Sequence, residues 1–237
     1  MLGSGLMFES VLGTPGTRIL VVAAHADDEV LGVGGTIHRA CTEWGAKVSF
    51  AIAADGRGTR NGAINLDQVR EAALSACSRI GASEVIFGGL GMNPDRPLDP
   101  FEVSGFVTES LRKLSPNVVF AHFDGDINIE HTVLNQATTY SLARPEFAHT
   151  VTLALEYEVP SSTERNPRTC FTPSLWVNLP AASMQAKQEA FAAYIHEQEA
   201  EPCGRSAHGI RALAAYRGMQ VGVEFCEAFH ITRGIAT

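Results

Sequence analysis

One histidine and three carboxylates stand together in the sequence AHADDE at positions 24–29, directly after an apolar run. Four ionisable groups at the end of a buried strand would cost several kcal/mol in lost hydration and repulsion unless a cation compensates them. His25 and Asp28 can reach one divalent ion from a tight loop, which leaves Asp27 free to act on a water molecule. A solvated N-cap cluster is the alternative, but a cap requires only one such side chain. We expect Glu29 to be structural or to support a metal ligand without binding the metal itself.

A second group of polar residues follows another apolar run, in the sequence HFDGDINIEH at positions 122–131. A catalytic metal site with an open position needs three protein ligands, so a third ligand must come from elsewhere in the chain. We predict His131 as that ligand. His122 is a candidate for a second ligand from this group, a supporting donor, a substrate contact or a buried core histidine.

Two arginines, Arg57 and Arg60, lie among glycines in the sequence DGRGTR at positions 55–60. Guanidinium groups bind phosphates, carboxylates and sugar hydroxyls, so both residues are candidates for substrate binding. A solvated loop explains the same pattern equally well.

The elements that must position these residues alternate between strands and helices. Regular alternation predicts an α/β fold with a Rossmann-like, mostly parallel twisted sheet and helices on both faces. We expect one domain over residues 1–237, with the site at the carboxyl ends of the strands. The loops 54–65, 88–99 and 122–128 are expected there, whereas 159–173 is not. Strands are predicted at 18–24, 47–53, 84–87, 117–121, 151–158, 175–178 and 224–231, and helices at 36–44, 66–80, 100–114, 129–142, 184–198 and 210–217.

The composition of the 237 residues limits the class of partner. The chain is 45% hydrophobic with a net charge of −8, which argues against nucleic acid and anionic membranes as main partners. Five scattered cysteines without a C-x-x-C pair predict free thiols in a cytoplasmic protein. We recognise no secretory signal and no apolar stretch long enough for membrane insertion. The oligomeric state is left open, with a homo-oligomer as one option.

These residues resemble the PIG-L/LmbE family of zinc-dependent N-deacetylases, whose first motif is A-H-P-D-D-E and whose later motif ends in D-H. The resemblance extends to the sequences REA at 70–72, YRG at 216–218 and EAF at 227–229. It implies that His25, Asp28 and His131 bind Zn²⁺, or another divalent metal such as Fe²⁺, and that Asp27 is the general base. The substrate would be an N-acetylated amino sugar on a nucleotide, glycolipid or other glycoconjugate, cleaved to acetate and a free amine.

Two positions depart from the family pattern. Ala26 replaces the usual proline, which removes a restraint on φ but no chemical group. Asn128 stands where the family has a histidine that polarises the substrate carbonyl. A neutral amide can donate a hydrogen bond to an oxyanion but cannot supply a proton. We therefore expect Asn128 to stabilise the oxyanion, and the general acid stays open, with protonated Asp27 as one candidate.

Other functions fit parts of the sequence. A nicotinamide-dependent oxidoreductase is suggested by the glycines of GVGG at 32–35 and by Asp55, but Ile37 occupies the place of the third glycine in G-x-G-x-x-G. Asn128 also suits a non-catalytic sugar-binding protein. Within the family, a thiol-conjugate amidase and an antibiotic deacetylase are further options.

Overall fold

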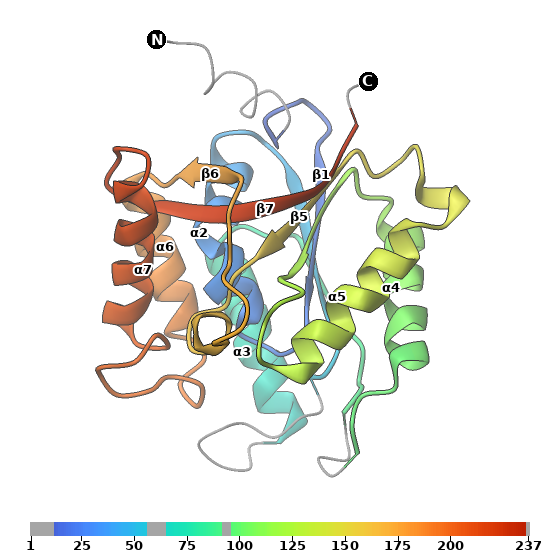
Figure 1. The fold of residues 1–237 in the computed structure, drawn as a ribbon, viewed down its shortest axis with the longest axis horizontal. Coiled ribbons are helices and arrows are strands. Elements are labelled where there is room, and N and C mark those ends of the chain that lie inside the picture. Colours follow the sequence, from blue (N-terminus) through green and yellow to red (C-terminus); the bar gives the residue numbers. More distant parts are fainter. Residues whose placement is uncertain (1–11, 56–64, 92–95, 236–237) are drawn as a thin grey trace.

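The computed structural model describes residues 12–55, 65–91 and 96–235 (Figure 1). Strands and helices alternate through the first two thirds of the chain, as the sequence predicts. The strands are β1 Arg18–Ala23, β2 Lys47–Ile52, β3 Glu84–Phe87, β4 Val118–His122, β5 Leu153–Tyr157, β6 Leu175–Asn178 and β7 Cys226–Gly234. The α-helices are α2 Asp28–Thr42, α3 Leu66–Arg79, α4 Pro100–Leu114, α5 Ile129–Leu142, α6 Ala181–Phe191 and α7 Ala207–Met219, with short 3₁₀ turns at Pro145–Phe147 and Thr163–Arg165.

The strands form one seven-stranded sheet in the order β3-β2-β1-β4-β5-β7-β6. Strands β1 to β5 run parallel to one another, and β7 is antiparallel to both β5 and β6. The predicted fold class is therefore confirmed. The chain winds outward from β1 through β2 to β3 and then returns to place β4 on the other side of β1. Ligands of such sheets bind in the crevice at this switch point.

Alternate residues of β1 pack on opposite faces of the sheet. Ile19 and Val21 belong to the larger apolar core, whereas Leu20 and Val22 belong to the smaller one. Figure 1 shows α4 and α5 on one side of the sheet and α2, α3, α6 and α7 on the other. Because helices cover both faces, the central strand β1 must be apolar on both, which explains the unbroken apolar run at 19–24.

Helix α2 begins at Asp28, eight positions before the predicted start at residue 36. The glycines at 32–35 weaken the helical pattern in the sequence, but tertiary packing requires them. A Cβ on Gly32 would lie 2.1 Å from Tyr157 Cδ2, and one on Gly35 would lie 2.6 Å from Leu179 Cδ1. Small residues therefore let α2 approach the sheet closely, and packing outweighs helix propensity.

Two further predictions need correction. Strand β5 is parallel to β4, so the loop 159–173 also leaves the sheet at the carboxyl edge. The helix predicted at 184–198 ends at Phe191, and the following residues form turns that bring Tyr194 against Glu29. Neither feature has a local sequence signal, because both depend on contacts distant in the chain.

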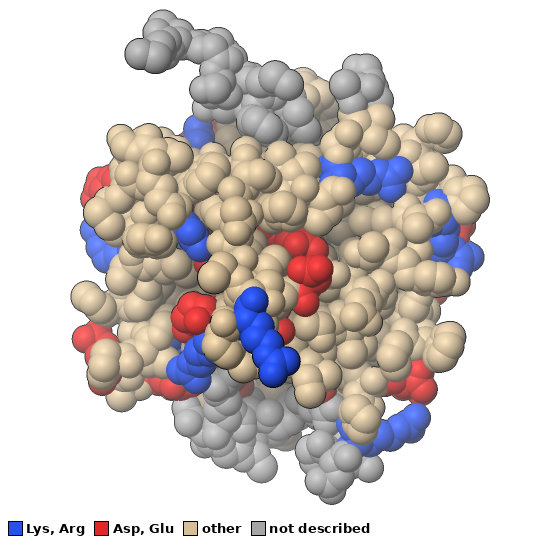
Figure 2. Space-filling model, viewed as in Figure 1, with Lys and Arg blue, Asp and Glu red and all other residues tan. Residues whose placement is uncertain are grey.

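The surface carries few features that point to a polyanionic partner. On the face shown in Figure 2, acidic side chains lie near the middle, and Lys and Arg side chains are spread without a continuous basic area. Within the described ranges, no helix has the length and apolar character to cross a bilayer.

Candidate metal centre

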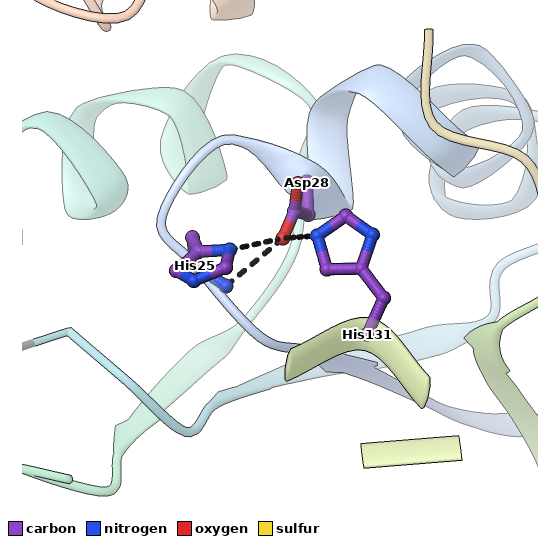
Figure 3. A group of neighbouring side chains, drawn as sticks. All are labelled: His25, Asp28 and His131. Atoms are coloured by element: carbon purple, nitrogen blue, oxygen red, sulfur yellow. Dashed lines mark hydrogen bonds and ion pairs between the residues drawn. The ribbon is translucent and has the colours of Figure 1, made fainter. Parts of the chain in front are cut away.

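Two segments meet at the switch point and bring three side chains together. His25 and Asp28 come from the turn between β1 and α2, and His131 comes from the first turn of α5 (Figure 3). One nitrogen or oxygen atom from each lies within 4.8 Å of the other two. Asp28 Oδ2 is 3.1 Å from His25 Nδ1 and 3.2 Å from His131 Nε2. The structure thus gathers the three residues that the sequence analysis selected as ligands.

The environment of these atoms fits a divalent metal. His131 is completely buried, and its Nε2 makes no hydrogen bond with the described residues, meeting Asp28 only as an ion pair. Burying a polar nitrogen without a hydrogen bond is costly, whereas a bound cation would satisfy it. Two imidazoles and one carboxylate are also a common ligand set for a catalytic zinc ion with an open position.

A carboxylate lies behind each candidate histidine ligand. Glu130 Oε2 is 2.5 Å from His25 Nε2, and Asp126 Oδ2 is 3.3 Å from His131 Nδ1. Asp126 Oδ2 also accepts a hydrogen bond from Ser162 Oγ at 2.9 Å. Carboxylates in this position fix the tautomer and orientation of a ligating imidazole. Sequence reasoning placed these acids in the cluster but did not assign them this role.

Electrostatic interactions concentrate negative charge at the centre. Burial opposes ionisation of Asp28, but His131 and His25 outweigh it and hold the pKa of Asp28 well below its usual range. Burial lowers the pKa of His25, yet hydrogen bonds with Asp28 and Glu130 raise it to about 10. The carboxylates therefore favour a positive charge at this point, which a divalent cation would supply.

Asp27 lies beside the three ligands in an unusual backbone conformation. It is only 1% exposed, and its φ of 127° is rare for a residue with a side chain. Glu29 Oε2 accepts a hydrogen bond from the Asp27 N–H at 3.0 Å, while Glu29 Oε1 accepts one from the Tyr194 hydroxyl. Burial raises the pKa of Asp27, and the neighbouring Arg205 opposes this shift. Glu29 thus supports the turn, in agreement with the structural role expected for it.

Arg205 is the contact that sequence reasoning missed. Its Nη1 donates a hydrogen bond to Asp27 Oδ2, and its side chain is 3% exposed. The residue precedes α7 and belongs to none of the motifs, so only the fold brings it to the site.

The structure places His122 next to the three proposed metal ligands. It is completely buried and stacks on His131 with ring centroids 3.9 Å apart. Its Nε2 accepts a hydrogen bond from the Ala24 N–H at 2.9 Å and lies 3.1 Å from the Tyr157 hydroxyl. Among the roles considered for His122, this burial favours support of the ligands over contact with a substrate.

Asn128 is the N-cap of α5. Its Oδ1 accepts a hydrogen bond from the Glu130 N–H at 2.9 Å, and its own N–H donates to Asp126 Oδ1 at 2.8 Å. In the part of the chain that the structure describes, Asn128 Nδ2 donates no hydrogen bond. Asn128 therefore orients the first turn of α5, and its side-chain amide N–H group is not used within the described residues.

Arg57 and Arg60, predicted to bind substrate, lie outside the described residues.

The residues that suggested a nicotinamide cofactor have structural roles in the fold. Asp55 accepts hydrogen bonds from Arg70 Nε at 2.7 Å and from the Gly89 N–H at 2.6 Å, so its carboxylate is not directed at a ribose. The glycines at 32–35 lie inside α2 and do not form a phosphate-binding turn.

Comparison with known proteins gives a family and a fold. Residues 20–141 match the PIG-L family, described as GlcNAc-PI de-N-acetylase. No curated protein matches the chain in sequence. Similar solved structures include the conserved protein TT1542 from Thermus thermophilus, with 24% identity over 92% of this chain and 96% of that chain and a TM-score of 0.71.

Two further structures share this fold. GalB, the 4-carboxy-2-hydroxymuconate hydratase from Pseudomonas putida, has 21% identity over 93% of this chain and 98% of that chain, with a TM-score of 0.73. The N,N'-diacetylchitobiose deacetylase from Pyrococcus horikoshii has 19% identity over 99% of this chain and 94% of that chain, with a TM-score of 0.73. At these identities the likeness establishes the fold alone.

Proposed function

Because the chain belongs to the PIG-L family, we propose that it is a metal-dependent hydrolase that removes the N-acetyl group from an N-acetylated amino sugar. Water would be consumed, and acetate and a free amine would be released. The observation that carries this proposal is the group of His25, Asp28 and His131, whose ligand atoms lie within 4.8 Å of one another. A deacetylase among the solved structures with this fold adds support.

His25, Asp28 and His131 would hold the metal, and we propose zinc on the basis of the two imidazoles and one carboxylate. When bound, a divalent ion lowers the pKa of water and polarises a carbonyl group. Asp126 and Glu130 would keep the two imidazoles oriented from behind.

Asp27 would act as the general base. Its Oδ2 accepts a hydrogen bond from Arg205 Nη1, whereas its Oδ1 accepts no hydrogen bond from the described residues. Asp27 can therefore take a proton from the attacking water on Oδ1 and return it to the leaving amine. Asn128 Nδ2 would donate a hydrogen bond to the oxyanion that forms when water adds to the acetamide carbonyl.

The proposed substrate is an acetamido sugar carried on a nucleotide, a glycolipid or another glycoconjugate. Arg57 and Arg60 remain candidates for binding its charged part. We further propose a cytoplasmic location, which the five free cysteines support.

The test is acetate release from free N-acetylglucosamine, a nucleotide-linked form and an inositol-glycolipid form, with and without a chelator. We expect release from at least one substrate, loss of release with the chelator and recovery with added zinc. Asp27→Asn should lower kcat by about 10²–10⁴-fold while retaining the metal, because it removes only the general base. Asp28→Asn should lose the metal.

The same fold also carries a hydratase, so fold alone does not select the reaction. A wild-type protein that binds metal but releases no acetate from any of the three substrates would contradict the deacetylase proposal. A protein that binds the sugars without metal and without turnover would instead be the non-catalytic family member considered above.

A further inference from the structure

The three guanidinium nitrogens of Arg205 contact two segments that are distant from it in the sequence. Its Nη1 donates to Asp27 Oδ2, its Nε donates to Ser161 Oγ at 2.8 Å, and its Nη2 lies 3.5 Å from Asp28 Oδ1. Glu197 Oε2 lies 3.9 Å from Nη1. A planar guanidinium held at three nitrogens cannot rotate, so it imposes its own orientation on the groups it contacts.

Backbone strain is concentrated at the partners of this arginine. In the described part of the chain, three residues other than glycine have a positive φ, and two of them are Asp27 at 127° and Ser161 at 79°. Such conformations cost roughly 1–3 kcal/mol each and persist only where surrounding contacts enforce them. Arg205 contacts both side chains, which links the two strained turns through one rigid group.

The backbone before Arg205 is also shaped for this contact. A Cβ on Gly204 would lie 2.9 Å from the Ser161 backbone nitrogen, so only glycine lets this segment approach the turn so closely. The guanidinium itself is 3% exposed. A buried arginine that only neutralised charge would not need this close backbone approach or a fixed hydroxyl acceptor.

We propose that Arg205 is a positioning residue that holds Asp27 Oδ2 and thereby presents Asp27 Oδ1 to the attacking water. This inference rests on the proposed function, because it assigns Arg205 a role through the proposed general base. Arg205 itself touches neither the substrate nor the reacting atoms. The planar arrangement of the guanidinium donors, and not their positive charge alone, fixes the orientation of the Asp27 carboxylate.

The test compares Arg205→Gln and Arg205→Lys with the wild type and with Arg211→Gln, an exposed arginine on α7 that serves as the matched control. We expect kcat to fall by about 100-fold in both Arg205 variants with KM unchanged, because misplacing a reacting group by about 1 Å costs this much. The control should keep the wild-type kcat. Full activity in Arg205→Lys or Arg205→Gln would overturn the proposal.

A double variant separates positioning from a general structural effect. In the background of Asp27→Asn, adding Arg205→Gln should cause no further loss of kcat, because Arg205 acts through Asp27. Losses that multiply would show that Arg205 acts independently, and the proposal would fail. Competition with a chelator measures the zinc affinity of Arg205→Gln. We expect this affinity to equal or exceed that of the wild type, because a positive charge near the metal has been removed. A large loss of affinity would assign Arg205 to metal binding instead and overturn the proposal.

Ser161→Ala provides a milder change if Arg205→Gln does not fold. It removes only the acceptor of Arg205 Nε, and we expect kcat to fall by about 10-fold with the zinc affinity retained. An unchanged kcat in folded Ser161→Ala would contradict the proposal. If the wild type releases no acetate at all, the proposed function fails first; if it does and the Arg205 variants match it, only the positioning role fails.

Discussion

The carboxylate of Glu130 offers a test of how the centre is supported, because it can be changed without touching a proposed ligand. Glu130 Oε2 lies 2.5 Å from His25 Nε2, and the Glu130 side chain is 19% exposed. Glu130→Gln keeps a hydrogen-bond acceptor but removes the negative charge that strengthens the imidazole as a ligand. Loss of such a supporting carboxylate lowers metal affinity by about 10–100-fold, or about 1.4–2.7 kcal/mol.

The partial exposure of Glu130 places the expected loss in the lower half of this range, since water can replace part of the lost interaction. Competition between the protein and a coloured chelator for zinc measures the affinity directly. Asp124→Asn is the matched control, because Asp124 is an exposed acid of the loop that precedes α5 and contacts neither histidine ligand. Equal zinc affinity in Glu130→Gln and the wild type, or an equal loss in the control, would refute this reasoning.

Three further predictions concern the framework of the site. Gly32→Ala places a methyl group against the buried Tyr157 ring and should lower the free energy of unfolding by about 1–3 kcal/mol; an unchanged denaturant midpoint would argue against this close packing. Lys187→Met removes the cation that pairs with buried Glu227 on β7 and should cost about 3–5 kcal/mol in the same assay, whereas a neutral effect would mean that the backbone N–H groups of Gly35 and Thr36 are sufficient to stabilise the carboxylate. In alkylation with iodoacetamide followed by peptide mapping, exposed Cys170 should react first, and Cys77 should react last because burial raises the pKa of its thiol to about 12.

Local patterns were sufficient to predict most of the framework. The apolar run at 18–24 and the helix starts at Pro100 and Ile129 depend on neighbouring residues, and the structure agrees with them. The start of α2 was predicted too late because the glycines at 32–35 are poor helix formers. Only the close approach of Tyr157 and Leu179 explains why glycine is needed there.

Some residues of the candidate site could likewise be predicted from the sequence, whereas other contacts depend on the fold. His25, Asp28 and His131 follow strand ends, so the topology of a parallel sheet was enough to expect them at one edge. The pairing of Glu130 with His25 depends on how the first turn of α5 is oriented relative to the turn after β1, which no sequence pattern contains. Arg205 is separated from Asp27 by 178 positions, and its contact depends on how the segment before α7 crosses the carboxyl edge.

The central claim is that one divalent ion binds between His25, Asp28 and His131. The most direct measurement is anomalous X-ray scattering at the zinc edge from crystals of the wild-type protein grown with zinc. We predict one strong peak within bonding distance of a nitrogen of His25, an oxygen of Asp28 and Nε2 of His131. No peak at this point under saturating zinc, or a peak held by other side chains, would contradict the account.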